Sequence, residues 1–313
     1  MIQRETDELY MRRCLQLAAC GRMESRPSPM VGAVIVADGR IIGEGYHVRC
    51  GEGHAEVNAF ASVRPEDEPR LKEATIYVSL EPCAHYGKTP PCADLIVSKG
   101  VKRVVVGTID PFAQVQGRGI KRLREAGIEV TTGVLESECQ WLNRRFFTFH
   151  SLHRPYILLK YAQTQDGFLD DHGRPLAIST SLTRMLVHRL RAEEDAILVG
   201  NTTYRQEQPR LDVRHWAGPS PRRFVLSHEH PIEEILETCL KEQLQSLIVE
   251  GGRQTLQSFI DRDLWDEIRI ETSPLIVGEG TPAPRLPQHC QKTSETTYGH
   301  NTIERYTNCQ NRL

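Results

Sequence analysis

The sequence predicts two α/β domains that meet near residue 150. Both halves of the chain alternate short apolar runs with amphipathic helical segments, which is typical of a mostly parallel sheet covered by helices. The chain has 313 residues, whereas a single hydrophobic core rarely exceeds about 250–300 residues. A polar, aromatic-rich stretch, WLNRRFFTFHSLHR, separates the two series. We therefore place the first domain at residues 1–148 and the second at residues 152–313.

In the first half, the residue pattern sets each expected element. A helix is expected over residues 7–19, ended by Gly21. Two apolar runs flank Asp38-Gly39, which indicates a β-hairpin. The further expected helices cover residues 54–63, 93–100 and 119–127, and the further expected strands cover residues 74–80, 101–109 and 128–133.

The second half repeats this alternation. A strand is expected before the turn Asp166-Gly167, and an amphipathic helix over residues 181–194. The further expected strands cover residues 196–200, 222–227, 246–252 and 266–278, with helices between the second and third of these and over residues 253–263.

Composition narrows the classes of function. The net charge is −2, from 39 basic and 41 acidic residues, so there is no basic excess to favour nucleic acid as a partner. The first residues lack the apolar core of a signal peptide, and no run approaches the roughly 20 apolar residues of a membrane span. Nine cysteines, an odd number, suggest free thiols or metal ligands in a reducing compartment. We expect a cytoplasmic protein without nucleic-acid or membrane partners.

A candidate zinc site is spread over two motifs. His54 and Glu56 open a helix directly after a glycine-rich turn, and Cys83 follows a strand as part of Glu-Pro-Cys. Zinc deaminases combine an H-x-E motif with P-C-x-x-C in this order. We predict that His54, Cys83 and Cys92 bind zinc and leave a fourth position open to water, as in catalytic sites. Glu56 would carry the proton of that water to the leaving amine.

Other interpretations of these residues remain open. A structural zinc site would need a fourth protein ligand, for which His85 is the nearby candidate. Cys50 and His47 could be spare ligands, and two isolated cysteines are usually core thiols. The Pro90-Pro91 pair favours a helix start, so that Cys92 would lie near a helix N-terminus, where the thiolate is stabilised.

The spacing of Cys83 and Cys92 is the feature that distinguishes this sequence from other zinc deaminases. Eight residues separate them, in PCAHYGKTPPC, where deaminases of cytidine and nucleic acids have two. This motif, with PSPMVGAVIV, HAEVNA and GTIDPFAQVQGRGIKRLREAGIEV, resembles the bifunctional riboflavin-biosynthesis pyrimidine deaminase/reductase family. The resemblance covers most of residues 5–150 and implies a cytidine-deaminase-like α/β/α sandwich.

The family implies a small-molecule substrate. This is 2,5-diamino-6-ribosylamino-4(3H)-pyrimidinone 5′-phosphate, whose 2-amino group is hydrolysed to ammonia. The resemblance implies that His47, His85 and Lys88 line the substrate pocket, and the last two offer donors that a phosphate attracts. Solvent-facing loop residues are the alternative. Ser28 stands where the family usually has a substrate-contacting asparagine.

The second domain resembles the dihydrofolate-reductase-like half of the same family. The resemblance lies in YAQTQDG, RAEEDAILVGNTTYRQEQPRLDVR and VEGGRQTLQSF. It implies NADPH as cofactor and hydride transfer to C1′ of the opened ribosyl group, which gives a ribityl chain. The glycine pair Gly251-Gly252 follows a strand and opens a helix, so its N–H groups could reach a phosphate. A plain tight turn would explain these glycines equally well.

The resemblance also assigns residues in this half. Residues expected to contact NADPH are Ala162, Thr203, Glu207, Gly252, Arg253, Gln254 and Thr255. Residues expected to contact the reductase substrate are Arg191, Leu211, Arg214 and Glu250. For the two arginines, surface salt bridges are the alternative. Enzymes with this pair of folds often assemble through the second domain, so a homodimer or homotetramer is expected.

Three departures from the family pattern affect this half. Glu207-Gln208-Pro209 replaces an aspartate motif, Ala177 replaces a tryptophan, and only about twenty residues separate Ser227 from Leu247. They leave an alternative open, in which an active deaminase carries a degenerate C-terminal domain for dimerisation or ligand binding. An editing deaminase is disfavoured, because the chain lacks a basic surface with stacking aromatics.

Overall fold

The chain folds into two compact units, each described here by itself. The structure, a computed structural model, describes residues 3–85, 90–112 and 116–311. The first unit comprises Met1–Leu152 and the second His153–Leu313. Among the described residues, no helix has both the length and the apolar character needed to cross a bilayer.

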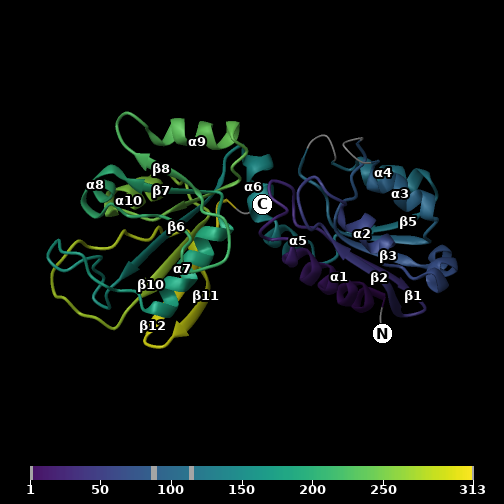
Figure 1. The fold of residues 1–313 in the computed structure, drawn as a ribbon, viewed down its shortest axis with the longest axis horizontal. Coiled ribbons are helices and arrows are strands. Elements are labelled where there is room, and N and C mark those ends of the chain that lie inside the picture. Colours follow the sequence, from purple (N-terminus) through teal and green to yellow (C-terminus); the bar gives the residue numbers. More distant parts are fainter. Residues whose placement is uncertain (1–2, 86–89, 113–115, 312–313) are drawn as a thin grey trace. The chain divides into compact units, whose positions relative to one another are not determined.

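The first unit contains a five-stranded sheet in the order β2-β1-β3-β4-β5 (Figure 1). Strand β1 pairs antiparallel with both β2 and β3, while β3, β4 and β5 are parallel. Its elements are α1 (Gln3–Cys20), β1 (Gly32–Ala37), β2 (Arg40–Tyr46), α2 (Ala55–Ala61), the 3₁₀ helix η1 (Pro65–Glu73), β3 (Thr75–Leu80), α3 (Cys92–Lys99), β4 (Arg103–Thr108), α4 (Arg118–Glu125), β5 (Glu129–Thr132), α5 (Glu136–Leu142) and α6 (Arg144–Leu152).

Helices cover both faces of this sheet, as expected for an α/β/α sandwich. Ala33 and Ile35 of β1 point to one face and pack with residues of α2 and α3, whereas Val34 and Val36 point to the other and pack with α1. This alternation follows from the two-residue repeat of a strand. Because both faces are buried, β1 is apolar throughout.

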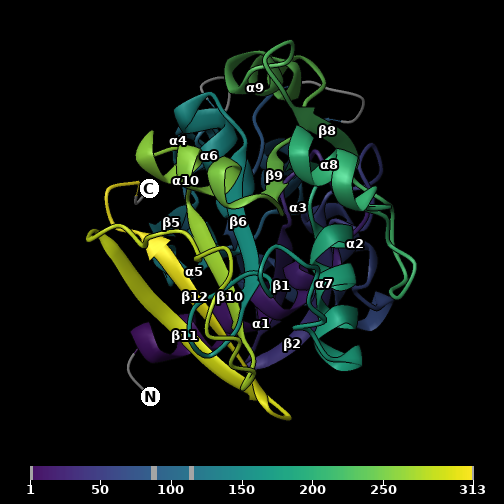
Figure 2. The same ribbon diagram turned by 90° about the vertical axis from the view of Figure 1, so that its left-hand side faces the viewer.

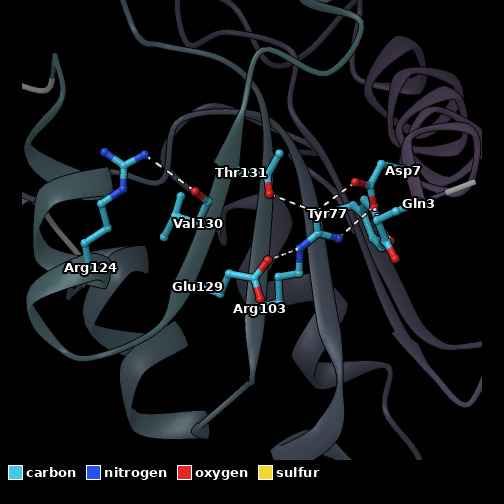
Figure 3. A network of polar contacts seen from close by, with 8 residues as sticks. All are labelled: Gln3, Asp7, Tyr77, Arg103, Arg124, Glu129, Val130 and Thr131. Atoms are coloured by element: carbon cyan, nitrogen blue, oxygen red, sulfur yellow. Dashed lines mark hydrogen bonds and ion pairs between the residues drawn. The ribbon is translucent and has the colours of Figure 1, made fainter.

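A buried ion pair fastens α1 to the sheet (Figure 3). Arg103 of β4 donates from Nη1 and Nη2 to the two carboxylate oxygens of Asp7 in α1, both at 2.8 Å. Tyr77 of β3 donates to Asp7 at 3.0 Å, and Arg103 also donates to Glu129 of β5 at 3.0 Å. Burial alone would raise the pKa of Asp7, but hydrogen bonds from Arg103 and Gln3 outweigh it and lower that pKa.

The second unit contains a seven-stranded sheet in the order β11-β12-β10-β6-β9-β7-β8. Strands β10, β6, β9, β7 and β8 are parallel, and β12 and β11 extend the sheet antiparallel (Figure 2). Its elements are β6 (Tyr156–Gln163), α7 (Ser181–Glu193), β7 (Ala196–Gly200), α8 (Asn201–Glu207), β8 (Arg222–Leu226), α9 (Ile232–Lys241), β9 (Ser246–Val249), α10 (Arg253–Asp261), β10 (Glu267–Thr272), β11 (Cys290–Tyr298) and β12 (Asn301–Asn308).

The core of this unit also has two sides. Ile157 and Leu159 of β6 pack with residues of α9 and α10, while Leu158 packs with Leu190 of α7. The short stretch between β8 and β9, which looked reduced in the sequence, holds α9.

Several elements differ from the sequence-based expectations. The polar stretch expected to connect the domains contains all of α6 and the end of α5, because its phenylalanines, including Phe146 and Phe147, pack against Leu80 of β3. Strands β11 and β12 were not predicted, since β11 is polar and exposed along nearly its whole length. The last predicted strand ends at Thr272 rather than continuing to Gly278.

Candidate active sites of the two units

His54, Cys83 and Cys92 form a compact group in the first unit. Their candidate ligand atoms all lie within 4.8 Å of one another. His54 Nδ1 is 3.3 Å from Cys92 Sγ and 3.6 Å from Cys83 Sγ. Two thiols and an imidazole are ligands that zinc prefers, and three of them leave one tetrahedral position open. The donor set therefore fits a catalytic zinc ion.

The start of α2 is placed by close backbone packing against β2. A Cβ on Gly45 would lie 2.5 Å from the backbone nitrogen of Ala59, so only glycine allows this approach. Asn58 donates to the carbonyl oxygens of Tyr46, at 2.8 Å, and Gly53, at 3.2 Å. These contacts fix the turn that leads into His54, the N-cap residue of α2.

Two backbone N–H groups at the start of α3 donate hydrogen bonds to Cys83. The Cys92 N–H donates to Cys83 Sγ at 3.3 Å, and the Ala93 N–H donates to the Cys83 carbonyl oxygen at 3.1 Å. Cys92 is the first residue of α3, after Pro91, as the sequence predicts. The hydrogen bond between the two thiol groups raises the pKa of Cys92 and lowers the pKa of Cys83 to about 4.

Glu56 lies in the first turn of α2 and is buried, with 3% of its surface exposed. Burial, together with the charge of Cys83, raises the pKa of Glu56 to about 7, despite the opposing effect of His54. A carboxyl group with a pKa near neutrality can both accept and release a proton. Glu56 therefore has the placement and the acidity of a general acid–base group.

The predicted deaminase substrate residues lie at different distances from this group. The ring of His47 stacks edge-on against His54, with centroids 5.3 Å apart. Its Nδ1 contacts the Gly53 carbonyl oxygen at 3.2 Å, and its buried Nε2 has no hydrogen-bond partner among the described residues. Burial lowers the pKa of His47. His85 is exposed, and Lys88 lies outside the described residues.

Ser28 is half-buried on a segment held by a distant side chain. Asn143 accepts from the Met30 N–H and donates to the Met30 carbonyl oxygen, both at 2.8 Å. The Ser28 hydroxyl donates to Cys50 Sγ at 3.4 Å. Cys50, weighed as a spare ligand, thus contacts Ser28 and is not part of the three-residue group.

One buried carboxylate near the zinc group was not singled out from the sequence. Glu81, just before Pro82 and Cys83, accepts hydrogen bonds from four backbone N–H groups. Only its position beside the Pro-Cys pair could have drawn attention to it. The segment it holds, at the start of α4, is far away in sequence.

In the second unit, Arg191 and Glu250 form a buried bidentate ion pair. Arg191 Nε and Nη2 donate to the two oxygens of Glu250, at 2.7 and 2.8 Å. Lys160 Nζ lies 3.9 Å from Glu250 and was not predicted as a site residue. Burial lowers the pKa of Lys160, while the charge of Glu250 opposes this effect. The Arg191 side chain, 12% exposed, is thus paired inside the fold rather than at the open surface.

The loop that carries Leu211 and Arg214 is fastened to α7. Arg191 Nη1 donates to the Asp212 carbonyl oxygen at 3.2 Å, and the Arg214 N–H donates to His188 Nδ1 at 3.3 Å. Leu211 is buried in the core beneath the loop, whereas Arg214 is exposed and pairs with the Asp212 carboxylate. His188, which is buried, was not predicted, because a lone histidine on a helix carries no motif.

The predicted cofactor residues converge at two helix starts. A Cβ on Gly252, whose φ is +74°, would lie 3.0 Å from Thr203 Oγ1. A Cβ on Gly200 would lie 2.3 Å from Thr255 Oγ1. These contacts bring the first turns of α8 and α10 together, and N–H groups at helix starts attract phosphate. The buried Nε of Arg253 has no partner among the described residues.

The other predicted cofactor residues lie on three different elements. Ala162 is half-buried near the end of β6, and Gln254 is exposed in the first turn of α10. Glu207 is the last residue of α8 and is exposed.

Comparison with known proteins extends these observations over nearly the whole chain. The cytidine and deoxycytidylate deaminase zinc-binding region matches residues 4–108, and the RibD C-terminal domain matches residues 155–234 and 230–308. The riboflavin biosynthesis protein RibD of Aquifex aeolicus is 38% identical to this chain, over 88% of this chain and 89% of its own length. RibD of Escherichia coli is 46% identical, over 76% of this chain and 64% of its own length.

The chain belongs to the RibD family.

Solved structures agree with this assignment. The Thermotoga maritima diaminohydroxyphosphoribosylaminopyrimidine deaminase/5-amino-6-(5-phosphoribosylamino)uracil reductase superposes with a TM-score of 0.88 at 33% identity, covering 98% of this chain and 99% of that one. Acinetobacter baumannii RibD gives a TM-score of 0.86 at 28% identity, covering 97% and 99%. The predicted fold classes of both halves are therefore confirmed.

As a RibD protein, the chain is a bifunctional deaminase and reductase of riboflavin biosynthesis. Its deaminase domain is a zinc-binding one, and its reductase domain uses NADPH. Both domains are present, so the bifunctional interpretation is favoured over a deaminase with a degenerate second domain.

Proposed function

We propose that His54, Cys83 and Cys92 hold the zinc ion and that Glu56 carries protons in the deaminase reaction. The observation that supports this most is the buried Glu56 carboxyl group beside a compact His-Cys-Cys cluster. Zinc, when bound, would activate a water molecule for attack on the pyrimidine ring. A non-catalytic structural site is disfavoured because the described residues contribute three ligands rather than four.

The substrate that we propose is 2,5-diamino-6-ribosylamino-4(3H)-pyrimidinone 5′-phosphate. Water adds to the ring carbon that bears the 2-amino group, a C–O bond forms, and the C–N bond breaks to release ammonia. Glu56 accepts a proton from the attacking water and gives it to the leaving nitrogen. The acidity of Glu56 suits both transfers, because its pKa of about 7 lies near neutral pH.

The substrate contacts follow from the surroundings of His54. We propose that the unpartnered Nε2 of His47 hydrogen-bonds to the substrate, since a buried polar atom without a partner is costly. The Ser28 hydroxyl would contact the same ligand. His85 and Lys88, on the long segment between the cysteines, would bind the phosphate.

For the reductase, we propose that NADPH lies along the starts of α8 and α10. Its phosphate groups would contact Thr203, Gly252 and the residues that follow, with Ala162, Glu207, Arg253, Gln254 and Thr255 completing the cofactor contacts. NADPH, when bound, would supply the hydride that, together with a proton, reduces C1′ of the opened ribosyl group to give a ribityl chain.

The reductase substrate would lie beside the buried ion pair. We propose that Arg191, Leu211, Arg214 and Glu250 contact it, with the exposed Arg214 available for the phosphate. The bidentate Arg191–Glu250 pair fixes both side chains, so that they meet the substrate without losing further side-chain freedom.

Two broader properties are also proposed. We place the enzyme in the cytoplasm, which is supported by the odd number of cysteines in the chain, nine, as expected where thiols stay reduced or bind metal. A homodimer or homotetramer is our proposal for the assembly. Size-exclusion chromatography with light scattering distinguishes these states from a monomer.

The direct test uses purified protein. Ammonia release from the diaminopyrimidine phosphate should require one zinc ion per chain, and chelation should abolish it. Given the deaminated intermediate, the same sample should oxidise NADPH, before and after zinc removal. Deamination without any NADPH oxidation would contradict the proposed reductase site, while ammonia release from zinc-free protein would contradict the proposed metal site.

A further inference from the structure

Glu81 is a buried carboxylate that the deaminase chemistry does not use. Glu81 has 4% of its surface exposed. Oε1 accepts hydrogen bonds from the N–H groups of Gly119, at 2.9 Å, and Ile120, at 3.2 Å. Oε2 accepts from those of Gly117, at 2.9 Å, and Asp110, at 3.3 Å. A single side chain therefore joins the start of α4 to the beginning of the segment that follows β4.

The start of α4, which Glu81 holds, also contacts the backbone next to Cys83, one of the proposed zinc ligands. A Cβ on Gly119 would lie 1.9 Å from the carbonyl oxygen of Pro82, so the first turn of α4 touches the residue before Cys83. On its other side, the Cys83 backbone is held by the Ala93 N–H, which donates to the Cys83 carbonyl oxygen at 3.1 Å. The backbone of Cys83 is thus restrained from both directions, and Glu81 provides one of the two restraints.

We propose that Glu81 is a positioning residue for the deaminase, which fixes Cys83 Sγ for zinc by joining the turn before it to α4. This inference rests on the proposed role of Cys83 as a ligand. A carboxylate suits the position because four N–H donors require a group that only accepts. A glutamine would turn its NH₂ group toward two of those donors. Replacing a residue that holds a metal ligand in place commonly changes metal affinity or activity by roughly 10–100-fold.

The test is Glu81→Gln in the full-length chain. Competition with a chromophoric chelator should show zinc affinity weakened by about 10–100-fold. NADPH oxidation by the same sample should stay at the wild-type rate, which reports that the second unit is folded, and the urea unfolding of the first unit should stay cooperative. The matched control is Glu125→Gln, which removes an exposed carboxylate from the other end of α4 and should leave zinc affinity unchanged.

Cobalt separates positioning from a general loss of stability. At saturating Co²⁺, Glu81→Gln should show shifted visible absorption bands, because the geometry of the thiolate ligand changes. An unaltered cobalt spectrum, with or without weaker affinity, would overturn the positioning role, and so would a zinc affinity within twofold of the wild type. Cys83→Ala tests the ligand assignment separately. Zinc retained at wild-type affinity in that variant would overturn the assignment itself.

Discussion

The deaminase and reductase sites assemble their functional groups in different ways. Cys92 and His54 are 38 positions apart, and the metal-binding group lies where two helices start and one strand ends. Arg191 and Glu250 of the reductase site are 59 positions apart and meet as a buried ion pair between a helix and the end of a strand. The first site depends on the type and local geometry of its ligands. The second depends on two opposite charges, Arg191 and Glu250, which must pair with each other because both are buried.

This difference predicts different responses to mutation. Glu56, the proposed proton carrier, lies in the first turn of α2, so its replacement by a side chain of equal size should stop chemistry and leave the fold intact. Arg191 pairs with Glu250 and also holds the loop at Asp212. Its replacement should affect stability and activity together.

The largest effect is expected for Glu56→Gln. Glutamine has the size of glutamate but cannot carry a proton, so the deaminase kcat should fall by about 10²–10⁴-fold. Zinc content and NADPH oxidation should not change. Ammonia release is the measurement, with Glu52→Gln, an exposed position before the same helix, as control. A kcat within tenfold of the wild type would remove Glu56 as the proton carrier.

Arg191→Ala should destabilise the second unit. It leaves the Glu250 carboxylate buried without its bidentate partner, and breaking such a pair typically costs about 3–5 kcal/mol. Urea unfolding of the full chain measures this loss, and NADPH oxidation should disappear while deamination continues. Arg189→Ala, on an exposed position of the same helix, is the control. Stability within 1 kcal/mol of the wild type, roughly, would show that the pair is not needed for folding.

Asp7→Asn should weaken the first unit by a smaller amount. Hydrogen bonds to charged groups contribute about 1.5–3 kcal/mol, and the variant keeps one acceptor for Arg103. Because the pKa of Asp7 is lowered in the folded chain, its contribution is complete above the unfolded value near 4 and is lost as pH falls through the folded value. The stability difference between wild type and variant should therefore be constant from pH 8 to 6 and shrink in acid. A difference that grows in acid would contradict this account.

The smallest effect is expected for His188. His188→Ala removes the acceptor for the Arg214 N–H, which should raise the reductase KM by roughly 2–10-fold, equivalent to one neutral hydrogen bond. His188→Asn keeps an acceptor and should recover part of this loss. Steady-state kinetics with the deaminated substrate measures both, and deaminase activity provides the internal reference. Equal KM values for the alanine variant and the wild type would mean that the loop does not need this contact.

The sequence predicts much more of the deaminase site than of the reductase site. His54, Cys83 and Cys92, predicted from their spacing, come together in the fold, because zinc sites use particular ligand types that a motif can show. The role of Glu56 stays a prediction. Glu81 escapes this reasoning, because the N–H groups it binds belong to a helix whose position only the fold reveals.

In the second unit, the sequence predicts the parallel strands but not the antiparallel strands β11 and β12 at the edge of the sheet. Strand β11 is polar and exposed, so it lacks the alternating pattern that marks a strand. His188 and Lys160 reach the site through long-range packing, which a single sequence does not encode in any local motif. The roles carried over by resemblance, such as those of Glu207 and Gln254, depend on a ligand and stay predictions.

The hydrogen bonds between Cys83, Cys92 and Ala93 have a consequence for evolution. They close the base of the segment between the cysteines and hold Cys83 to the start of α3. Insertions or exchanges within that segment would leave the metal in place, since lengthening a closed loop costs little free energy. The enzyme can therefore acquire a new substrate range by altering one short stretch of gene while its metal-binding group is inherited unchanged.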